Sequence, residues 1–143
     1  MANPAIVEVD DPRALPPDLS QRAFRSEVSG SSMRMFLGIA DKLELSVEER
    51  CALLGDITRQ TYYNWAKSKS ITLSRDQLER IALVMGVFRG LRTLFADDQS
   101  AIRWLKSPNR EVQFGGRSPL DVACTDGFGG LYAVRRYIDA WRG

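Results

Sequence analysis

Between residues 57 and 69 the chain alternates apolar residues with polar side chains that can form paired hydrogen bonds. At helical spacing, Ile57, Tyr62, Trp65 and Ala66 fall on one side and the polar residues on the other. Arginine can bond guanine through two atoms, glutamine or asparagine can bond adenine in the same way, and lysine contacts phosphate. The polar side therefore predicts contacts with duplex DNA through Arg59, Gln60, Thr61, Tyr63, Asn64, Lys67 and Lys69. The alternative is an ordinary surface helix, because short helices with a polar outer face are common.

The last third of the chain carries a second set of candidates, of the types enriched at protein–protein interfaces. Tyrosine, tryptophan and arginine contribute most to such interfaces. The last three residues, Trp-Arg-Gly, could enter a cleft of a partner as a flexible plug, although Trp141 could equally belong to the core. The predicted partner-facing residues are Arg117, Ser118, Tyr132, Arg135, Arg136, Trp141, Arg142 and Gly143. Their neighbours are expected to build the fold instead, namely Gly115, Gly116, Pro119 and Leu120.

The 143-residue chain contains no histidine, which excludes catalysis by an imidazole base. Its two cysteines, Cys51 and Cys124, can form neither a disulfide framework nor a four-ligand zinc site. We expect both to be buried small hydrophobes in a reducing compartment. The sequence therefore predicts no metal, no cofactor and no enzymatic activity.

A glycine-rich segment at residues 126–130 is the one feature that suggests nucleotide chemistry, because glycines before a helix can cradle phosphate. No lysine follows at the spacing of a phosphate-binding loop, so we expect Asp126 to cap the next helix. A carrier of a phosphorylated ligand, bound by Tyr132 and nearby arginines, remains an alternative.

Charge and proline are distributed unevenly along the chain. Residues 1–20 hold four acidic residues against one arginine, and four of the six prolines, so we expect residues 1–30 to form a flexible or extended arm. The rest of the chain carries a basic excess larger than the overall +2, which is compatible with nucleic acid. No apolar run is long enough to span a membrane and no secretory signal is evident, so we expect a cytoplasmic protein.

The candidates are positioned by predicted helices, and no alternating strand pattern is evident, so the predicted fold is all-α. Apolar residues at helical spacing predict helices from Ser32 to Leu43 and along the last stretch of the chain. Helix starts are marked by Ser46 with Glu49, by Thr58, by Ser74 with Gln77, and by Ser118 followed by Pro119. Gly86 and Gly90 interrupt the helix after Ser74 and suggest a bend or a close helix contact there.

The helices at 47–54 and 58–67 resemble the helix-turn-helix of Xre-type regulators. Leu54-Gly55 is similar to the turn, and the run from Thr61 to Trp65 is similar to the recognition helix, whose residues enter the major groove. The turn is one residue longer than usual.

Two later motifs resemble the C-terminal toxin-binding domain of the Xre/MbcA/ParS antitoxin family. They are Leu-x-x-Pro-Asn at residues 105–109 and Gly-Gly-x-x-Pro-Leu-Asp at residues 115–121. The resemblance covers residues 32–143 and implies a bacterial antitoxin that inhibits an NAD-consuming RES-domain toxin and represses its own operon at operator DNA.

We therefore expect an N-terminal arm (1–30), a helix-turn-helix domain that also dimerises (31–96) and a toxin-binding domain (97–143). The expected partners are the RES-domain toxin, operator DNA and a second copy of the chain, for which the helix at 74–95 could supply the interface. A stand-alone transcriptional regulator without a toxin is the alternative.

Overall fold

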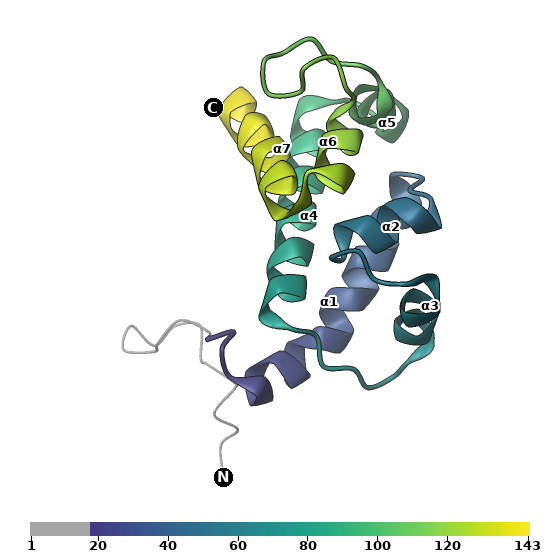
Figure 1. The fold of residues 1–143 in the computed structure, drawn as a ribbon. Coiled ribbons are helices and arrows are strands. Elements are labelled where there is room, and N and C mark those ends of the chain that lie inside the picture. The colour runs from purple at the N-terminus through teal and green to yellow at the C-terminus, as the bar shows by residue number, and fades with distance from the viewer. Residues whose placement is uncertain (1–17) are drawn as a thin grey trace.

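The structure, a computed structural model, describes residues 18–143. Within them the chain forms seven helices and no strand, which confirms the all-α prediction. Figure 1 shows α4 as a long central helix with α1 beside it, α3 toward one end of the molecule and α5 to α7 toward the other. The helices are α1 (Arg22–Lys42), α2 (Val47–Leu53), α3 (Arg59–Lys67), α4 (Arg75–Leu94), α5 (Asp98–Lys106), α6 (Pro119–Thr125) and α7 (Gly127–Arg142).

Helix α1 begins at Arg22, inside the arm that the sequence predicted over residues 1–30. That prediction is wrong for the helical part, because the segment after the prolines is anchored to the core. Ser29 is fully buried, and its hydroxyl accepts a hydrogen bond of 2.8 Å from the backbone N–H of Leu73. Residues 1–17 of the predicted arm lie outside the described residues.

Four of the predicted helix starts after α1 are confirmed. The side-chain oxygens of four residues each accept a hydrogen bond from the backbone N–H three residues later, which satisfies a donor that the helix itself leaves free. These residues are Ser46, Thr58, Ser74 and Ser118. At α2 and α4 the third helical residue also accepts from the capping residue, so the full capping box forms.

The glycines of α4 allow α7 to pack closely against it. A Cβ at Gly86 would lie 1.9 Å from a guanidinium nitrogen of Arg135, and one at Gly90 would lie 2.1 Å from Cγ2 of Ile138. The predicted close helix contact is therefore confirmed. Since α7 of the same chain covers both glycines, only the other faces of α4 remain for the predicted homodimer.

One continuous core joins the two halves of the chain. Buried residues of α1, α2 and α4 belong to the same cluster as those of α5, α6 and α7. The Nζ of Lys106, in α5, donates a 2.6 Å hydrogen bond to the carbonyl oxygen of Glu44, which has a positive φ of 55° in the turn before α2. The helical halves are thus held in one arrangement by packing and by polar contacts.

The two cysteines are free thiols. Cys51 is buried, as predicted, but Cys124 is only half-buried, with its Sγ 3.9 Å from the carbonyl oxygen of Glu49. Burial raises the pKa of Cys124 to about 12, so this thiol stays protonated at neutral pH. Among residues 18–143, no cluster of potential metal-binding side chains occurs and no helix has the length and apolarity needed to cross a membrane.

Candidate functional site

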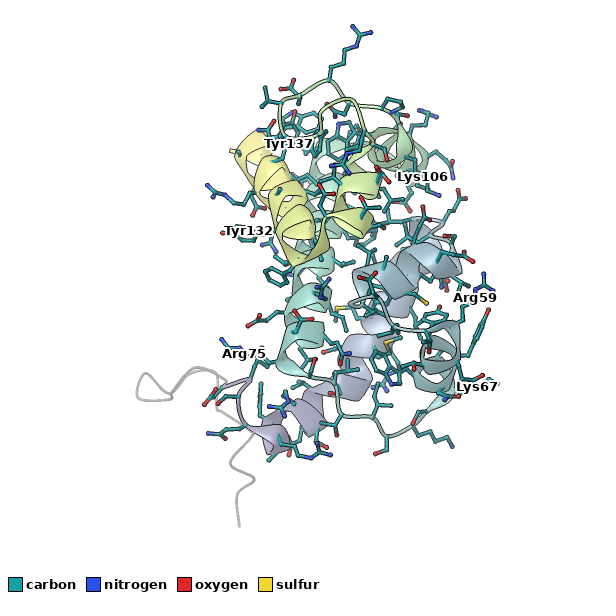
Figure 2. The ribbon with its side chains drawn as sticks, in the orientation of Figure 1. Arg59, Lys67, Arg75, Lys106, Tyr132 and Tyr137 are labelled. Carbon is teal, nitrogen blue, oxygen red and sulfur yellow. The ribbon has the colours of Figure 1, made fainter. Side chains whose placement is uncertain are left out.

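The residues predicted to contact DNA follow one side of α3 and the loop after it, where Figure 2 labels Arg59 and Lys67. Thr61 is half-buried, and its backbone N–H donates to Thr58 Oγ1 as part of the N-cap. The exposed members are Arg59, Gln60, Tyr63, Asn64, Lys67 and Lys69. The structure thus brings the predicted set together on one surface.

The opposite side of α3 was predicted less accurately. Tyr62 is buried, and Ile57 and Trp65 are partly buried against the core, as expected. Ala66, however, is exposed, so its predicted inward orientation is wrong. The nine-residue helix contacts the core along a narrow stripe, so only about one residue per turn is buried, and Ala66 lies outside that stripe.

Two polar contacts arrange the outer face of α3 before any ligand binds. Arg59 pairs with Glu48 in the first turn of α2, and Gln60 Nε2 donates to Asn64 Oδ1 at 3.1 Å, one turn away. Both pairs are exposed, so they contribute little to stability, but they limit the conformations of side chains that could contact bases. The sequence did not predict that Glu48 pairs with Arg59, although it did place Glu48 in the capped first turn of α2.

A partly buried arginine holds α3 against α2. Arg50 donates from Nε to the Leu45 carbonyl oxygen at 2.9 Å and from Nη1 to the Tyr62 hydroxyl at 3.0 Å, and it pairs with Asp41 at 2.9 Å. The backbone reverses between the helices at Gly55 and Asp56, which have positive φ values of 100° and 59°. These features fix the angle at which α3 leaves the core.

Three of the predicted partner-facing residues of α7, Tyr132, Arg136 and Trp141, lie exposed on the other side of the molecule, where Figure 2 labels Tyr132. Tyr132 is 47% exposed, and the guanidinium carbon of Arg136 lies 5.9 Å from the centre of its ring. Beside this pair is a groove of about 550 Å³. The groove is lined by Gln113, Ala133, Arg136, Tyr137, Ala140 and Trp141.

Trp141 belongs to an aromatic cluster and is also 46% exposed, so it contributes to the core and to the surface. Its ring lies 5.7 Å from those of Phe95 and Trp104, measured between centroids. Because α7 continues to Arg142, the end of the chain is helical here, and the predicted flexible plug is wrong. The aromatic contacts hold Trp141 in place.

Arg117 and Ser118 stabilise the ends of α6. Arg117 donates from both terminal nitrogens to the two carboxylate oxygens of Asp126, and Ser118 caps the start of α6. The side chain of Asp126 therefore does not cap α7, contrary to the sequence prediction, because Arg117 occupies it. Both predicted partner-facing residues have a structural role, and contact with a partner remains a prediction for them.

The contact between Arg117 and Asp126 predicts a dependence of stability on acid. Hydrogen bonds from Arg117 hold the pKa of Asp126 below its ordinary value of 3.8. Asp126 has the lower pKa in the folded state, so its ionised carboxylate stabilises the fold. This stabilisation is complete above pH 3.8, the ordinary pKa, and is lost as the pH falls through the pKa of Asp126 in the folded protein. The free energy of unfolding, measured by urea unfolding, should therefore fall less between about pH 6 and about pH 2 in Asp126→Asn than in the unchanged protein. An unchanged loss in the variant would contradict this role.

The remaining predicted partner-facing residues lie apart from this contact. Arg135 packs over Gly86 and pairs with Asp139 at 3.0 Å, while Arg142 lines a different groove, between α1 and α4. The backbone N–H of Gly143 donates to the Ala140 carbonyl oxygen. The predicted set is thus divided among the α6 ends, the outer face of α7 and the α1/α4 side.

Comparison with known proteins identifies both halves of the chain. A family model for the antitoxin Xre-like helix-turn-helix domain matches residues 26–86, and one for the antitoxin Xre/MbcA/ParS C-terminal toxin-binding domain matches residues 90–143. The uncharacterized protein y4oB of Sinorhizobium fredii is 34% identical over 113 residues, which cover 79% of this chain and 85% of that protein. The chain therefore belongs to the Xre/MbcA/ParS antitoxin family, with a helix-turn-helix domain followed by a toxin-binding domain.

Proposed function

We propose that this antitoxin covers the active site of a RES-type, NAD-degrading toxin and represses its own operon by binding operator DNA through α3. The observation that carries the proposal is the separation of two exposed surfaces. The polar face of α3 and the Tyr132 face of α7 lie on different sides of one packed molecule (Figure 2), so one ligand would leave the other surface free.

The outer face of α7 has the chemistry expected of an inhibitory surface. The exposed Arg136 and the half-exposed Trp141 line the groove beside α7, and the exposed ring of Tyr132 lies next to Arg136. These residue types contribute most binding energy at protein interfaces. Steric inhibition requires only a complementary surface, so the chain needs no catalytic group and no cofactor. In this proposal it acts in the cytoplasm.

For DNA binding we propose a homodimer of this chain. A two-fold pair can present two copies of α3 to half-sites one helical turn apart, and this doubles the contacts with the operator. Arg59 and Gln60 begin α3, and residues near the start of a recognition helix commonly contact base edges.

Substitutions on α3 should weaken operator binding and leave toxin inhibition intact. We expect Arg59→Ala and Gln60→Ala each to cost about 1–3 kcal/mol of binding free energy, because each removes a paired contact to a base. Titration of operator DNA, followed by fluorescence anisotropy, measures the loss. Arg103→Ala, an exposed arginine on α5, is the control and should bind normally. A variant that loses both activities because it is misfolded, as circular dichroism would show, is replaced by another substitution on α3; a folded variant that loses both would contradict the separation.

Substitutions on α7 should have the opposite effect. The double substitution Tyr132→Ala with Arg136→Glu should weaken toxin binding by at least about 2 kcal/mol, because it removes two interface side chains and reverses a charge. Growth rescue on co-expression with a RES toxin, and NAD hydrolysis by the purified pair, are the measurements. Operator binding should be unchanged.

These assays also distinguish the alternatives. If the unmodified chain leaves the RES toxin fully active, the chain is a regulator without this target. If calorimetry finds micromolar binding of NAD or another nucleotide to the chain alone, a ligand carrier is the better description.

A further inference from the structure

A second groove, on the side formed by α1 and α4, is occupied by no described residue. It has a volume of about 690 Å³ and contains five apolar or small residues, including Met35, which is 46% exposed. Lys42, Arg89, Arg92 and Arg142 also line it, and no acidic residue does. We refer to it as the α1/α4 groove. The five apolar or small residues are Met35, Gly38, Ile39, Met85 and Phe88.

The cations of the α1/α4 groove are largely uncompensated. Arg92 lies 3.6 Å from Asp98, but no carboxylate of residues 18–143 is within ion-pair distance of Lys42, Arg89 or Arg142. Lys42 and Arg92 instead stack on Phe88, 5.7 and 5.1 Å from the ring centre. An occupant should therefore combine apolar side chains with negative charge.

The charge of the α1/α4 groove disfavours a homodimer in which this groove of one copy packs against the same groove of the other. In a two-fold contact the same patch meets itself, so the four cations of one copy would face those of the other. Juxtaposed like charges disfavour such a pairing.

The chain itself contains a segment with the required chemistry. Residues 6–11 read Ile-Val-Glu-Val-Asp-Asp, three aliphatic residues and three acids. We propose that residues 6–11 dock in the α1/α4 groove of the same chain, with the aliphatic side chains against Met35, Met85 and Phe88 and the acids beside the cations.

The length of the connecting chain permits this contact. Asp18 is close enough to Arg75, the first residue of α4, for their charges to interact. The groove begins at Met85, ten residues farther along α4, which is about 15 Å at 1.5 Å per residue. Six residues lie between Asp11 and Asp18, and the seven Cα–Cα steps of an extended chain from one to the other span about 23 Å. The segment can therefore reach the groove without leaving its own molecule.

Zero-length crosslinking of the full chain tests the contact. A carbodiimide joins a carboxylate to an amine only where the two touch, and Lys42 alone among Lys42, Lys67, Lys69 and Lys106 lines the groove. We expect coupling of Glu8, Asp10 or Asp11 to Lys42, in species of monomer mass, to exceed coupling to Lys67 or Lys69 by about tenfold. Lys42→Arg keeps the charge and should remove the product.

Two results would overturn the proposal. One is equal coupling of the segment to Lys67, Lys69 and Lys42, and the other is coupling to Lys42 only in species of dimer mass.

A spectroscopic measurement tests the same contact without crosslinking. Neutralising the segment with Glu8→Gln, Asp10→Asn and Asp11→Asn should shift the methyl NMR signals of Met35 and Met85. The signal of Met33, which is 2% exposed, should stay unchanged as the internal reference. Unshifted signals of Met35 and Met85 would also overturn the proposal. Neither experiment involves toxin or DNA, so the outcome is independent of the proposed function.

Discussion

Phe114→Ala is expected to lower the free energy of unfolding by about 3–5 kcal/mol, the range observed for truncation of a buried phenylalanine. Phe114 is 1% exposed, and its ring centre lies 5.0 Å from that of Tyr137 and 6.0 Å from that of Trp104. The substitution would leave a cavity under the aromatic cluster that positions α7. Urea unfolding followed by tryptophan fluorescence or circular dichroism measures the loss.

The same loop supplies a matched control for this substitution. Val112 lies two residues before Phe114 but is 94% exposed, so Val112→Ala removes no buried contact. We expect its effect to stay within about 0.5 kcal/mol. Equal effects of the two substitutions would mean that the loop does not pack on α5 and α7 as described. Because Phe114 supports Tyr137, a residue of the α7 groove, we also expect Phe114→Ala to weaken toxin inhibition more than DNA binding.

Gly130→Ala is expected to destabilise the fold by about 3 kcal/mol, the upper part of the usual range for overpacking. A Cβ at this position would lie 2.3 Å from the carbonyl oxygen of Val122 and 2.6 Å from Cβ of Asp126. The first of these atoms is backbone of α6, so it cannot rotate away. Either α7 must move from α6 or the contact must be strained, and thermal or urea unfolding should report the loss.

The neighbouring glycine is the control, because it differs only in what surrounds it. A Cβ at Gly129 would meet no heavy atom within 4 Å, and the residue lies in the same first turn of α7. Since alanine is the better helix former, Gly129→Ala should stabilise the chain by up to about 1 kcal/mol. If both alanines were tolerated equally, the close crossing of α6 and α7 would be refuted.

The local structure of this protein could be predicted wherever it depends on a few consecutive residues. The capping residues Ser46, Thr58, Ser74 and Ser118 were identified because an N-cap needs only a side-chain oxygen and an N–H three residues later. Family membership was also readable, because its motifs are short and contiguous. The prediction from local sequence was wrong at Asp126. Its carboxylate was expected to cap α7 but accepts hydrogen bonds from Arg117, nine residues away in sequence.

The beginning of α1 shows the limit of composition as a guide. The prolines and acids of the first twenty residues predicted an arm up to residue 30, but the helix begins at Arg22. What stabilises that first stretch is the buried Ser29 hydroxyl bonded to Leu73, a contact across 44 residues. No local pattern contains that information.

The sequence by itself determined the helical class, the four capped helix starts, the outward face of α3 and the family. Only the tertiary structure decided which glycines α7 covers, that Arg117 bonds Asp126, and that the cations of α1, α4 and α7 surround one groove. The physical reason is the separation in sequence between the residues that interact. Caps and helical periodicity are interactions within about one turn of helix, whereas crossing helices and shared grooves depend on the packing of residues far apart in the chain.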